Sequence, residues 1–309
     1  MDDRSLLIRR MTWEAPGVLS LELVSPDGQD LAAFSPGAHV DLHLADGLVR
    51  QYSLCGDPND RGVYRVAVRE VSGGLGSGAI HRQVRPGALV RVVGPRNNFP
   101  LLPSPRYLFV AGGIGITPLL PMMRAATGAW SLLYCVRQVG AAPFLRELRD
   151  LGGTVSLHVS EAGTRLDTSA RLGRPEADTM LYCCGPETLM TAVEEATRDW
   201  PEGKVHFEWF APRSRPEDET SGAFQVVCAQ SGVTLSVPPG RSILDLVTEA
   251  GIEAPRSCEQ GICGTCECRV LEGEVDHRDS ILSASERAAN QTMMICVSRA
   301  KSGRLVLDL

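Results

Sequence analysis

The first third of the chain alternates apolar and polar residues in short runs that glycine and proline interrupt. From Leu6 to about Leu102 these runs include LSLELVSP, AHVDLHL, VYRVAVREV and ALVRVVGP. A period of two places every second side chain on one face, which is typical of strands with one buried and one exposed face. The pattern therefore predicts antiparallel strands, in a barrel or a sandwich, over residues 1–102.

From Arg106 the pattern changes to apolar runs that are each followed by a turn or a helical segment. We interpret RYLFVAGG, WSLLYCVR, TVSLHVS and TMLYCCG as buried strands, and APFLRELRDL and TLMTAVEEAT as helices. Buried strands that alternate with helices are typical of a parallel sheet with helices on both faces. We therefore expect an α/β doubly wound domain over residues 103–212.

A polar and charged run, PRSRPEDETSG, follows without apolar periodicity. It predicts an interdomain linker, which we place at residues 213–222. Beyond it, FQVVCAQ and VTLSVPPG predict a hairpin, SILDLVTEAG predicts a helix and RLVLDL predicts a last strand. Residues 223–309 are thus expected to form a third domain.

The composition excludes several classes of function. The chain has 309 residues, a formal net charge of −6 and no basic run, whereas binding to nucleic acid requires clustered cations that displace counterions. No stretch approaches the roughly 18 to 20 apolar residues of a membrane span, and the amino end lacks the order of a secretory signal. We expect a cytoplasmic protein that binds neither nucleic acid nor membrane.

Four of the ten cysteines have the spacing of metal ligands. Cys258, Cys263 and Cys266 form a C-x4-C-x2-C motif, and Cys296 follows after 29 intervening residues. This is the plant-type spacing for a 2Fe-2S cluster. The competing metal is zinc, but zinc motifs usually pair two short units such as C-x2-C, and this chain has one. We interpret four other cysteines as structural: Cys55, Cys135, Cys228 and Cys268.

The segment AGGIGITP, Ala111 to Pro118, follows an apolar strand and opens a predicted helix. Gly112, Gly113 and Gly115 can bring backbone N–H groups against a pyrophosphate at the start of that helix. The alternative is that these glycines only allow the strand-to-helix turn.

A second strand of the same domain ends at Cys184, before Gly185 and Pro186. The carboxyl edge of a doubly wound sheet is where a dinucleotide lies, so Cys184 can contact a nicotinamide ring. Free cysteines are more often small buried hydrophobes. We prefer that interpretation for Cys183, and it stays open for Cys184.

The first domain offers two candidate contacts for a flavin. Arg50 and Ser53 can hold a phosphate or a flavin carbonyl by hydrogen bonds, and Tyr52 can lie against the ring. Gly76 and Ser77 stand at the start of a predicted helix, where free N–H groups bind phosphate. The alternatives are that Tyr52 is an ordinary strand residue and Ser77 only an N-cap.

Together these segments resemble the phthalate dioxygenase reductase family, notably its vanillate O-demethylase reductase branch. The resemblance covers nearly the whole chain and rests on RQYSL, PRNNFPL, AGGIGITP, YCCGPETLM, HFEWF and SCEQGICGTC, in that order. It implies an antiparallel β-barrel domain that binds FMN, an α/β domain that binds NADH, and an α+β plant-type ferredoxin domain of the β-grasp type. That branch commonly has an RGGS-type phosphate loop, whereas this chain reads SGGLGSG. Arg82 and Arg85 are candidates to replace the missing arginine.

The resemblance also implies a set of site residues. Phe210 in HFEWF would cover the flavin ring, although core packing beside the linker is an alternative, and Cys184 would orient the nicotinamide. The flavin contacts would be Arg50, Tyr52, Ser53, Gly76, Ser77 and the backbone around Val66 and Val68. The nucleotide contacts would be Gly112, Gly113, Gly115, Thr117, Pro118, Gly185 and Pro186, and the cluster ligands Cys258, Cys263, Cys266 and Cys296.

The implied function is that of a reductase that moves electrons from NADH through FMN and a 2Fe-2S cluster to a Rieske-type oxygenase or demethylase, a transient protein partner. A flavin must stand between the two other carriers, because nicotinamide gives a hydride and a cluster accepts one electron. Arg137 could favour NADPH, but the family has an arginine here and prefers NADH. The alternatives are a reductase for a haem monooxygenase or another one-electron acceptor, and a non-enzymatic redox sensor.

Overall fold

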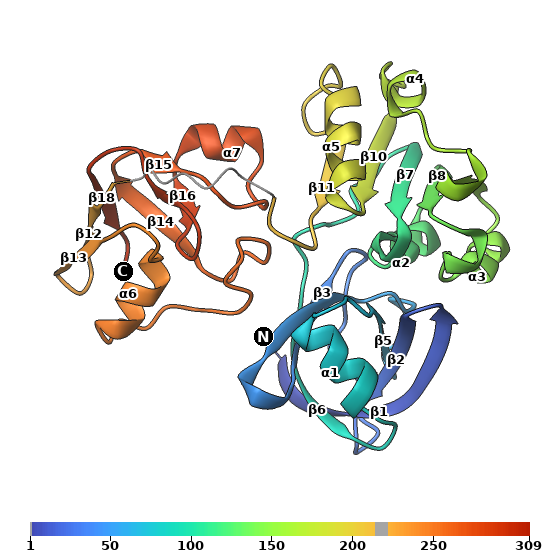
Figure 1. Cartoon of the computed structure of the whole chain (residues 1–309), viewed down its shortest axis with the longest axis horizontal. Coiled ribbons are helices and arrows are strands. Elements are labelled where there is room, and N and C mark those ends of the chain that lie inside the picture. The colour runs from blue at the N-terminus through green and yellow to red at the C-terminus, as the bar shows by residue number, and fades with distance from the viewer. Residues whose placement is uncertain (1, 214–221) are drawn as a thin grey trace. The chain divides into compact units, whose positions relative to one another are not determined.

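The alternating strands of the first hundred residues pair antiparallel and close on themselves. In the computed structural model, which describes residues 2–213 and 222–309, they form a sheet in the order β4-β3-β6-β1-β2-β5 (Figure 1). A bridge between Leu54 and Val66 joins the two outer strands. The predicted antiparallel barrel is therefore confirmed. Its elements are β1 (Asp2–Ala15), β2 (Val18–Val24), β3 (His39–His43), β4 (Val49–Ser53), β5 (Tyr64–Arg69), α1 (Leu75–Gln83) and β6 (Leu89–Arg96).

The barrel strands show why the alternation matters. On β5, Tyr64, Val66 and Val68 are at most 3% exposed and pack inside the barrel. Ala67, between them, faces the other way and belongs to a different buried cluster. One strand thus supplies two cores, because successive side chains point to opposite faces.

The second part of the chain forms a sheet of parallel strands in the order β11-β10-β7-β8-β9. The chain reverses its direction of growth between β7 and β10, and ligands of such sheets bind outside the carboxyl ends of strands at this switch point. The predicted doubly wound domain is confirmed. The strands are β7 (Arg106–Gly112), β8 (Ala129–Val136), β9 (Thr154–Val159), β10 (Thr179–Cys184) and β11 (Val205–Glu208), with helices α2 (Leu119–Ala125), α3 (Leu145–Asp150), α4 (Thr168–Leu172) and α5 (Glu187–Ala196).

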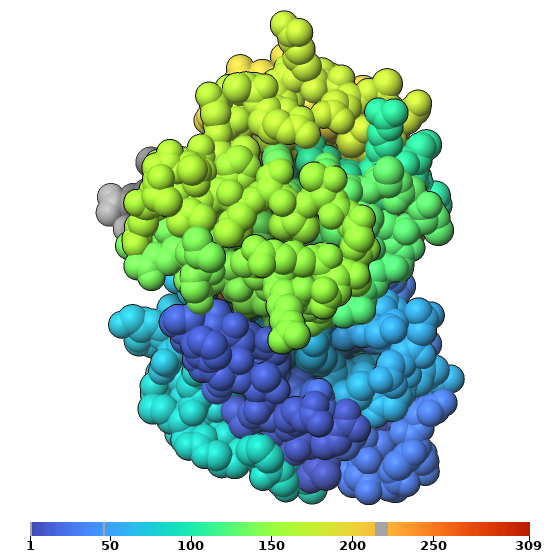
Figure 2. All heavy atoms as spheres, turned by 90° about the vertical axis from the view of Figure 1, so that its right-hand side faces the viewer, coloured from blue at the N-terminus to red at the C-terminus, as the bar shows by residue number. Residues whose placement is uncertain are grey.

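The barrel and the parallel sheet share one hydrophobic core. A single cluster of buried residues includes Ala15, Cys55 and Ala67 of the barrel together with Phe109 and Tyr134 of the sheet. Figure 2 looks onto this contact, with the blue amino-terminal strands next to the green segment that contains α3. Accordingly, Met1–Phe210 behaves as one compact unit.

The second compact unit is Ala211–Leu309. Its sheet has the order β13-β12-β18-β14-β16, in which β12 and β18 are parallel and the other neighbours are antiparallel. The predicted hairpin, helix and last strand are confirmed. The elements are β12 (Phe224–Cys228), β13 (Val233–Val237), α6 (Ile243–Glu249), β14 (Glu267–Glu272), β15 (Val275–Asp276), α7 (Ala284–Ala289), β16 (Thr292–Met294), β17 (Arg299–Ala300) and β18 (Arg304–Leu307).

The predicted linker at residues 213–222 falls, from 214 to 221, outside the described residues. The domain limits at residues 102, 212 and 222 stay predictions. Among the residues that the structure describes, none of the helices has the length and apolar character needed to cross a bilayer.

Candidate functional site

The two glycine-containing segments meet at the switch point of the parallel sheet. A Cβ atom on Gly112 would lie 2.4 Å from Pro186 Cδ, and one on Gly115 would lie 2.2 Å from the carbonyl oxygen of Cys184. Only glycine permits backbones to approach this closely. The glycines are therefore required by the contact between the two segments.

The turn after β7 differs in detail from its prediction. Gly113–Ile116 is a 3-10 turn, and α2 begins only at Leu119. Gly113 has a φ of 54°, and Pro118 is fixed at the helix start, where its missing N–H costs no hydrogen bond. Thr117 is 2% exposed and its hydroxyl donates to the Ile114 carbonyl, so Thr117 and the buried Pro118 shape the turn.

Cys184 is fully buried at the end of β10. Burial raises the pKa of its thiol well above the ordinary value, so the thiol stays protonated and is no nucleophile at neutral pH. Gly185 and Pro186, directly after it, are the more exposed residues of this edge. Cys183 is also fully buried, with its sulfur 3.6 Å from Met190 Sδ, in agreement with the packing role predicted for it.

A carboxyl group that the sequence analysis missed joins this edge to the barrel. Ser53 Oγ donates a 3.3 Å hydrogen bond to Glu208 Oε2, from the end of β4 to the end of β11. Burial raises the pKa of Glu208 to about 8, against the smaller opposing effect of the Ser53 hydrogen bond. Glu208 lies in the HFEWF segment, which the sequence analysis did use, but only Phe210 was chosen from it as a candidate.

The start of α1 has the features of a phosphate site. A Cβ on Gly76 would lie 2.5 Å from Arg50 Cγ, so the side chain of Arg50 crosses the first turn of the helix. The first N–H groups of an α-helix have no intrahelical acceptor and attract anions. The Ser77 hydroxyl accepts a 3.1 Å hydrogen bond from the Val71 N–H, which is a local role different from the predicted N-cap alternative.

Arg82 and Arg85 belong to the other end of α1. Arg82 pairs with Glu70 at 3.4 Å, and Arg85 donates to the carbonyls of His81, Arg82 and Val84. Arg85 is thus used at the carboxyl end of the helix, where a cation complements the helix dipole. Arg50 lies against Gly76 in the first turn, and the Arg82 guanidinium reaches back to Gly78, where a Cβ would lie 2.2 Å from Arg82 Nη2.

The other flavin candidates differ in burial. Burial raises the pKa of Tyr52 on β4 to about 12, so its hydroxyl is uncharged. Val66 and Val68 are at most 1% exposed, and the flavin contacts predicted for their backbone stay predictions. Phe210 is 40% exposed whereas its neighbour Trp209 is 7% exposed. Trp209 is therefore the residue that packs in the core, and the core-packing alternative does not hold for Phe210.

The four predicted cluster ligands come together as two pairs. Hydrogen bonding links Cys258 with Cys263 and Cys266 with Cys296, and in each pair the hydrogen bond from the partner lowers the pKa of one thiol, Cys263 or Cys266. Within residues 2–213 and 222–309, no group of three or more His, Cys, Asp or Glu side chains is placed to hold one metal ion. Two pairs match the two irons of a 2Fe-2S cluster, each of which takes two thiolates.

Backbone N–H groups of the loop point at the cysteine sulfurs. The N–H of Gln260 lies 3.3 Å from Cys258 Sγ, and that of Thr265 lies 3.4 Å from Cys263 Sγ. Such bonds stabilise thiolates, so the loop fits a cluster in both its donors and its backbone.

The remaining cysteines are packed away from these pairs. Cys55 and Cys228 are fully buried, and Cys135 is half-buried. The sulfur of Cys268 lies 3.6 Å from the Arg269 carbonyl oxygen, and burial raises its pKa to about 12. These surroundings agree with the structural roles predicted for them.

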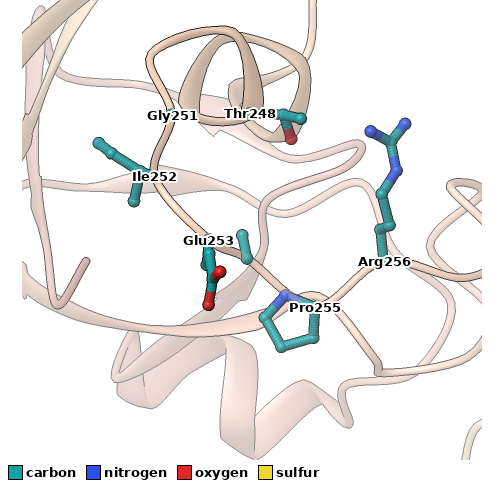
Figure 3. Close-up of a pocket in the computed structure, with 7 residues that line it drawn as sticks. Thr248, Gly251, Ile252, Glu253, Pro255 and Arg256 are labelled. Atoms are coloured by element: carbon teal, nitrogen blue, oxygen red, sulfur yellow. The ribbon is translucent and has the colours of Figure 1, made fainter.

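A pocket of about 650 Å³ lies directly before the cysteine loop. Figure 3 shows its wall, which runs from the end of α6 through Ile252 and Pro255 to Arg256, two residues before Cys258. Arg256 makes a 2.9 Å salt bridge with Glu259 inside the loop. Cys258 is the only ligand candidate that is not buried, so this side of the loop is the accessible one.

Comparisons with known proteins cover the whole chain. A family model described as a 2Fe-2S iron-sulfur cluster binding domain matches residues 226–301, and one described as an oxidoreductase FAD-binding domain matches residues 17–100. A tert-butanol monooxygenase / tert-amyl alcohol desaturase reductase subunit of Aquincola tertiaricarbonis is 43% identical, over 99% of this chain and 96% of its own length. A vanillate O-demethylase oxidoreductase of Pseudomonas sp. is 39% identical, over 98% and 99%.

Solved structures of two kinds resemble the chain. Phthalate dioxygenase reductase is 36% identical, with a TM-score of 0.71 over 99% of this chain and 98% of its own. An intact type IV self-sufficient cytochrome P450 monooxygenase is 41% identical, with a TM-score of 0.91. The match covers 99% of this chain but only 41% of that longer one.

Proposed function

Because the chain belongs to the phthalate dioxygenase reductase-type family, we propose that it draws electrons from NADH and passes them through FMN and a 2Fe-2S cluster to a Rieske-type oxygenase or demethylase. The chain is an oxidoreductase with a flavin-binding and an iron–sulfur domain, and it acts with an oxygenase component. The identity of the flavin, the nucleotide and the type of oxygenase are the proposed part.

The observation that carries this proposal is that one chain contains a flavin-type barrel, a doubly wound sheet and two cysteine pairs, and matches phthalate dioxygenase reductase over 99% of its length. A bound flavin would supply the conversion between the two-electron chemistry of nicotinamide and the one-electron chemistry of the cluster. The protein's share is to hold these groups in reach of one another and to exclude water.

We assign the flavin phosphate to the first turn of α1 and the guanidinium of Arg50. The close packing of Arg50 on Gly76 supports this assignment, because it brings a cation and free N–H groups to the same place. Tyr52, Ser53 and the backbone of β5 would hold the ring, and Phe210 would cover it. One such phosphate cradle suits FMN, which carries a single phosphate.

We assign the nucleotide to the edge formed by Gly112, Gly115, Gly185 and Pro186. The preference for NADH is supported by Glu161, which holds Arg137 at 3.9 Å and accepts a 2.6 Å hydrogen bond from Gln138. A carboxylate near the end of β8 repels the 2'-phosphate of NADPH and can accept from ribose hydroxyls. Cys184, protonated and buried, would support the nicotinamide by shape alone.

The test is to add NADH anaerobically to the purified protein, record the visible spectrum, and determine flavin and iron chemically. We expect both flavin and iron–sulfur bands to bleach, FMN to be released on denaturation, and two irons per chain. Release of FAD would show that the flavin is FAD and not FMN. Bleaching by NADPH but not by NADH would show that the nucleotide is NADPH. Bleaching of neither band would favour the redox sensor over the reductase.

A haem monooxygenase is the second candidate acceptor. It is favoured by the full-length similarity of this chain to part of a cytochrome P450 monooxygenase chain. Transfer from the reduced protein to a purified Rieske oxygenase, compared with transfer to a purified P450 haem domain, separates the two candidates. A transient complex and a cytoplasmic location complete the proposal.

A further inference from the structure

A fully buried carboxylate, Asp279, lies beside the cysteine loop. It is 0% exposed. Its Oδ2 accepts hydrogen bonds from the N–H groups of Ile281 at 3.1 Å and Leu282 at 2.8 Å. Its Oδ1 has no hydrogen-bond partner among the described residues. A buried charge with one unsatisfied oxygen is costly, so its place in the fold calls for an explanation.

Asp279 packs directly against the loop that carries the ligands. Gly261 lies between Cys258 and Cys263 and has a φ of 68°. A Cβ on Gly261 would lie 3.1 Å from Asp279 Cα and 2.6 Å from Val297 Cγ2, so both neighbours already fill that space. The Gly261 carbonyl accepts a 2.8 Å hydrogen bond from the Ser280 N–H.

The same glycine packs beside a ligand candidate. A Cβ on Gly261 would meet the side chain of Val297, the residue that directly follows Cys296. The bonds from Asp279 to Ile281 and Leu282 fix the turn that presents the Ser280 N–H to Gly261. Asp279 is thereby connected to the cluster site through one residue, both by packing and by hydrogen bonds.

One cation partly offsets this charge. Arg287 NH2 lies 3.7 Å from Asp279 Oδ2 and donates at 2.7 Å to the Asp279 carbonyl. His277 Nδ1 lies 3.9 Å from Oδ1, but burial lowers the pKa of His277, so it is neutral at pH 7. Asp279 and Arg287 therefore form a charged pair that contacts the cysteine loop through Gly261.

We propose that Asp279 sets the reduction potential of the iron–sulfur site: its buried negative charge disfavours the added electron, and Arg287 counteracts it. The potential of such clusters depends on nearby charge, hydrogen bonds to sulfur and solvent exposure. Asp279 acts as a positioning and electrostatic residue and touches no ligand itself. This inference rests on the cluster site of the proposed function.

The experiment compares four variants of the full-length protein loaded with its cofactors. Asp279→Asn removes the negative charge with little change of shape, and Arg287→Gln removes the positive charge. Asp276→Asn and Arg278→Gln are matched controls, because these two residues form a 2.6 Å pair on the same segment with 31% and 22% exposed side chains. The readouts are iron per chain and the midpoint potential of the reduced-cluster EPR signal.

We expect Asp279→Asn to favour cluster reduction by about tenfold, which is about 59 mV for one electron, and Arg287→Gln to disfavour it. The controls should move the potential less. Shifts of the midpoint potential in opposite directions for these two variants support an electrostatic effect. A loosened loop would shift the potential of both variants in the same direction. Equal potentials for Asp279→Asn and Asp276→Asn, at full iron content, would overturn the inference.

Loss of iron has a different meaning in the variant and in the unaltered protein. If Asp279→Asn loses its iron, Arg287→Gln decides: a lower potential supports the inference, and an unchanged or higher potential overturns it. If the unaltered protein contains no iron, the cluster site fails and the inference fails with it. Two irons per chain without opposite shifts would overturn the inference and leave the reductase function standing.

Discussion

Ser53 and Glu208 are 155 positions apart in the sequence, yet the Ser53 hydroxyl donates a 3.3 Å hydrogen bond to the Glu208 carboxyl group. The contact joins the barrel to the last strand of the parallel sheet. Ser53 was predicted to contact flavin, and Glu208, the last residue of β11, pairs with Cys184 of β10. The pair therefore places a titratable group between the residues proposed for the flavin and those proposed for the nicotinamide.

Glu208 should make the stability of the protein depend on pH. Its pKa is raised to about 8 from an ordinary value of 4.5, so between these values the folded state holds a proton that the unfolded state has released. Stability then falls as pH rises from about 4.5 to about 8. Because Glu208 is partly exposed, the slope should stay below about 1.4 kcal/mol per pH unit.

Thermal unfolding across this pH range checks the prediction with Glu208→Gln, which should flatten the slope. Ser53→Ala should move the upper end of the window to higher pH, because the Ser53 hydrogen bond lowers the pKa of Glu208. If the unaltered protein and Glu208→Gln show parallel pH profiles, Glu208 is ionised in the folded state at neutral pH.

Gly76→Ala should weaken flavin binding. The new Cβ would lie 2.5 Å from Arg50 Cγ and would displace that side chain from the helix start. We expect a loss of tenfold or more in flavin affinity, or about 1.4 kcal/mol, measured by fluorescence titration of the deflavinated protein. Gly140→Ala is the control, because a Cβ there meets nothing within 4 Å. Equal affinities for the two variants would remove Arg50 from the phosphate site.

Glu147→Gln should destabilise the unit Met1–Phe210. Glu147 of α3 bonds Arg65 of β5 at 2.6 Å and also Arg124 of α2, so it ties the barrel to the sheet. Burial opposes its ionisation, but Arg65 and Arg124 outweigh burial and hold the pKa of Glu147 below its ordinary value. This stabilisation is present at neutral pH and is lost as pH falls below about 4.5.

The expected loss for Glu147→Gln is about 1–3 kcal/mol at pH 7, and less at pH 4. Glu176→Gln is a matched control, since its pair with Arg171 has side chains that are 42–43% exposed, and exposed pairs contribute about 0–1 kcal/mol. Denaturant unfolding at the two pH values measures both. A loss no larger than that of the control would show that the shared core alone holds the two parts together.

Cys268→Ser should leave the visible iron–sulfur spectrum unchanged, although Cys268 is two residues from a ligand candidate. On β14 its sulfur lies 3.6 Å from the Arg269 carbonyl oxygen and 4.0 Å from that of Asp308, in the core of the second unit. Cys266→Ser, the comparison variant, should abolish the spectrum. A spectrum lost in Cys268→Ser at normal secondary structure would mean that the ligands are misassigned.

The sequence predicted the fold well because the periodicity of buried residues is local information. The alternation of Tyr64, Val66 and Val68 specified a barrel strand, and the apolar run ending at Gly112 specified a parallel one. The start of α2 was harder to predict, because the turn before it packs Gly112 on Pro186 and Gly115 on Cys184, residues that lie more than sixty positions later.

Only part of the candidate site could be predicted, because only some of its residues follow a local sequence pattern. The four cysteines carry a spacing that can be read directly, and the structure brings them together in two pairs. Glu208 and Asp279 carry no such spacing. An acidic residue in a sequence usually lies in solvent, and only the fold shows that Ser53 bonds one and that Gly261 packs on the other.

The hydrophobic cluster that spans the barrel and the parallel sheet has a consequence for building chimaeras. A reductase cut at residue 102 would expose Ala15, Cys55 and Ala67, which are at most 5% exposed in the intact unit, and would separate Ser53 from Glu208. A fragment ending there should aggregate or lose its flavin. Grafts that exchange the electron-delivering domain should therefore join donor and recipient after Phe210, where the first compact unit ends.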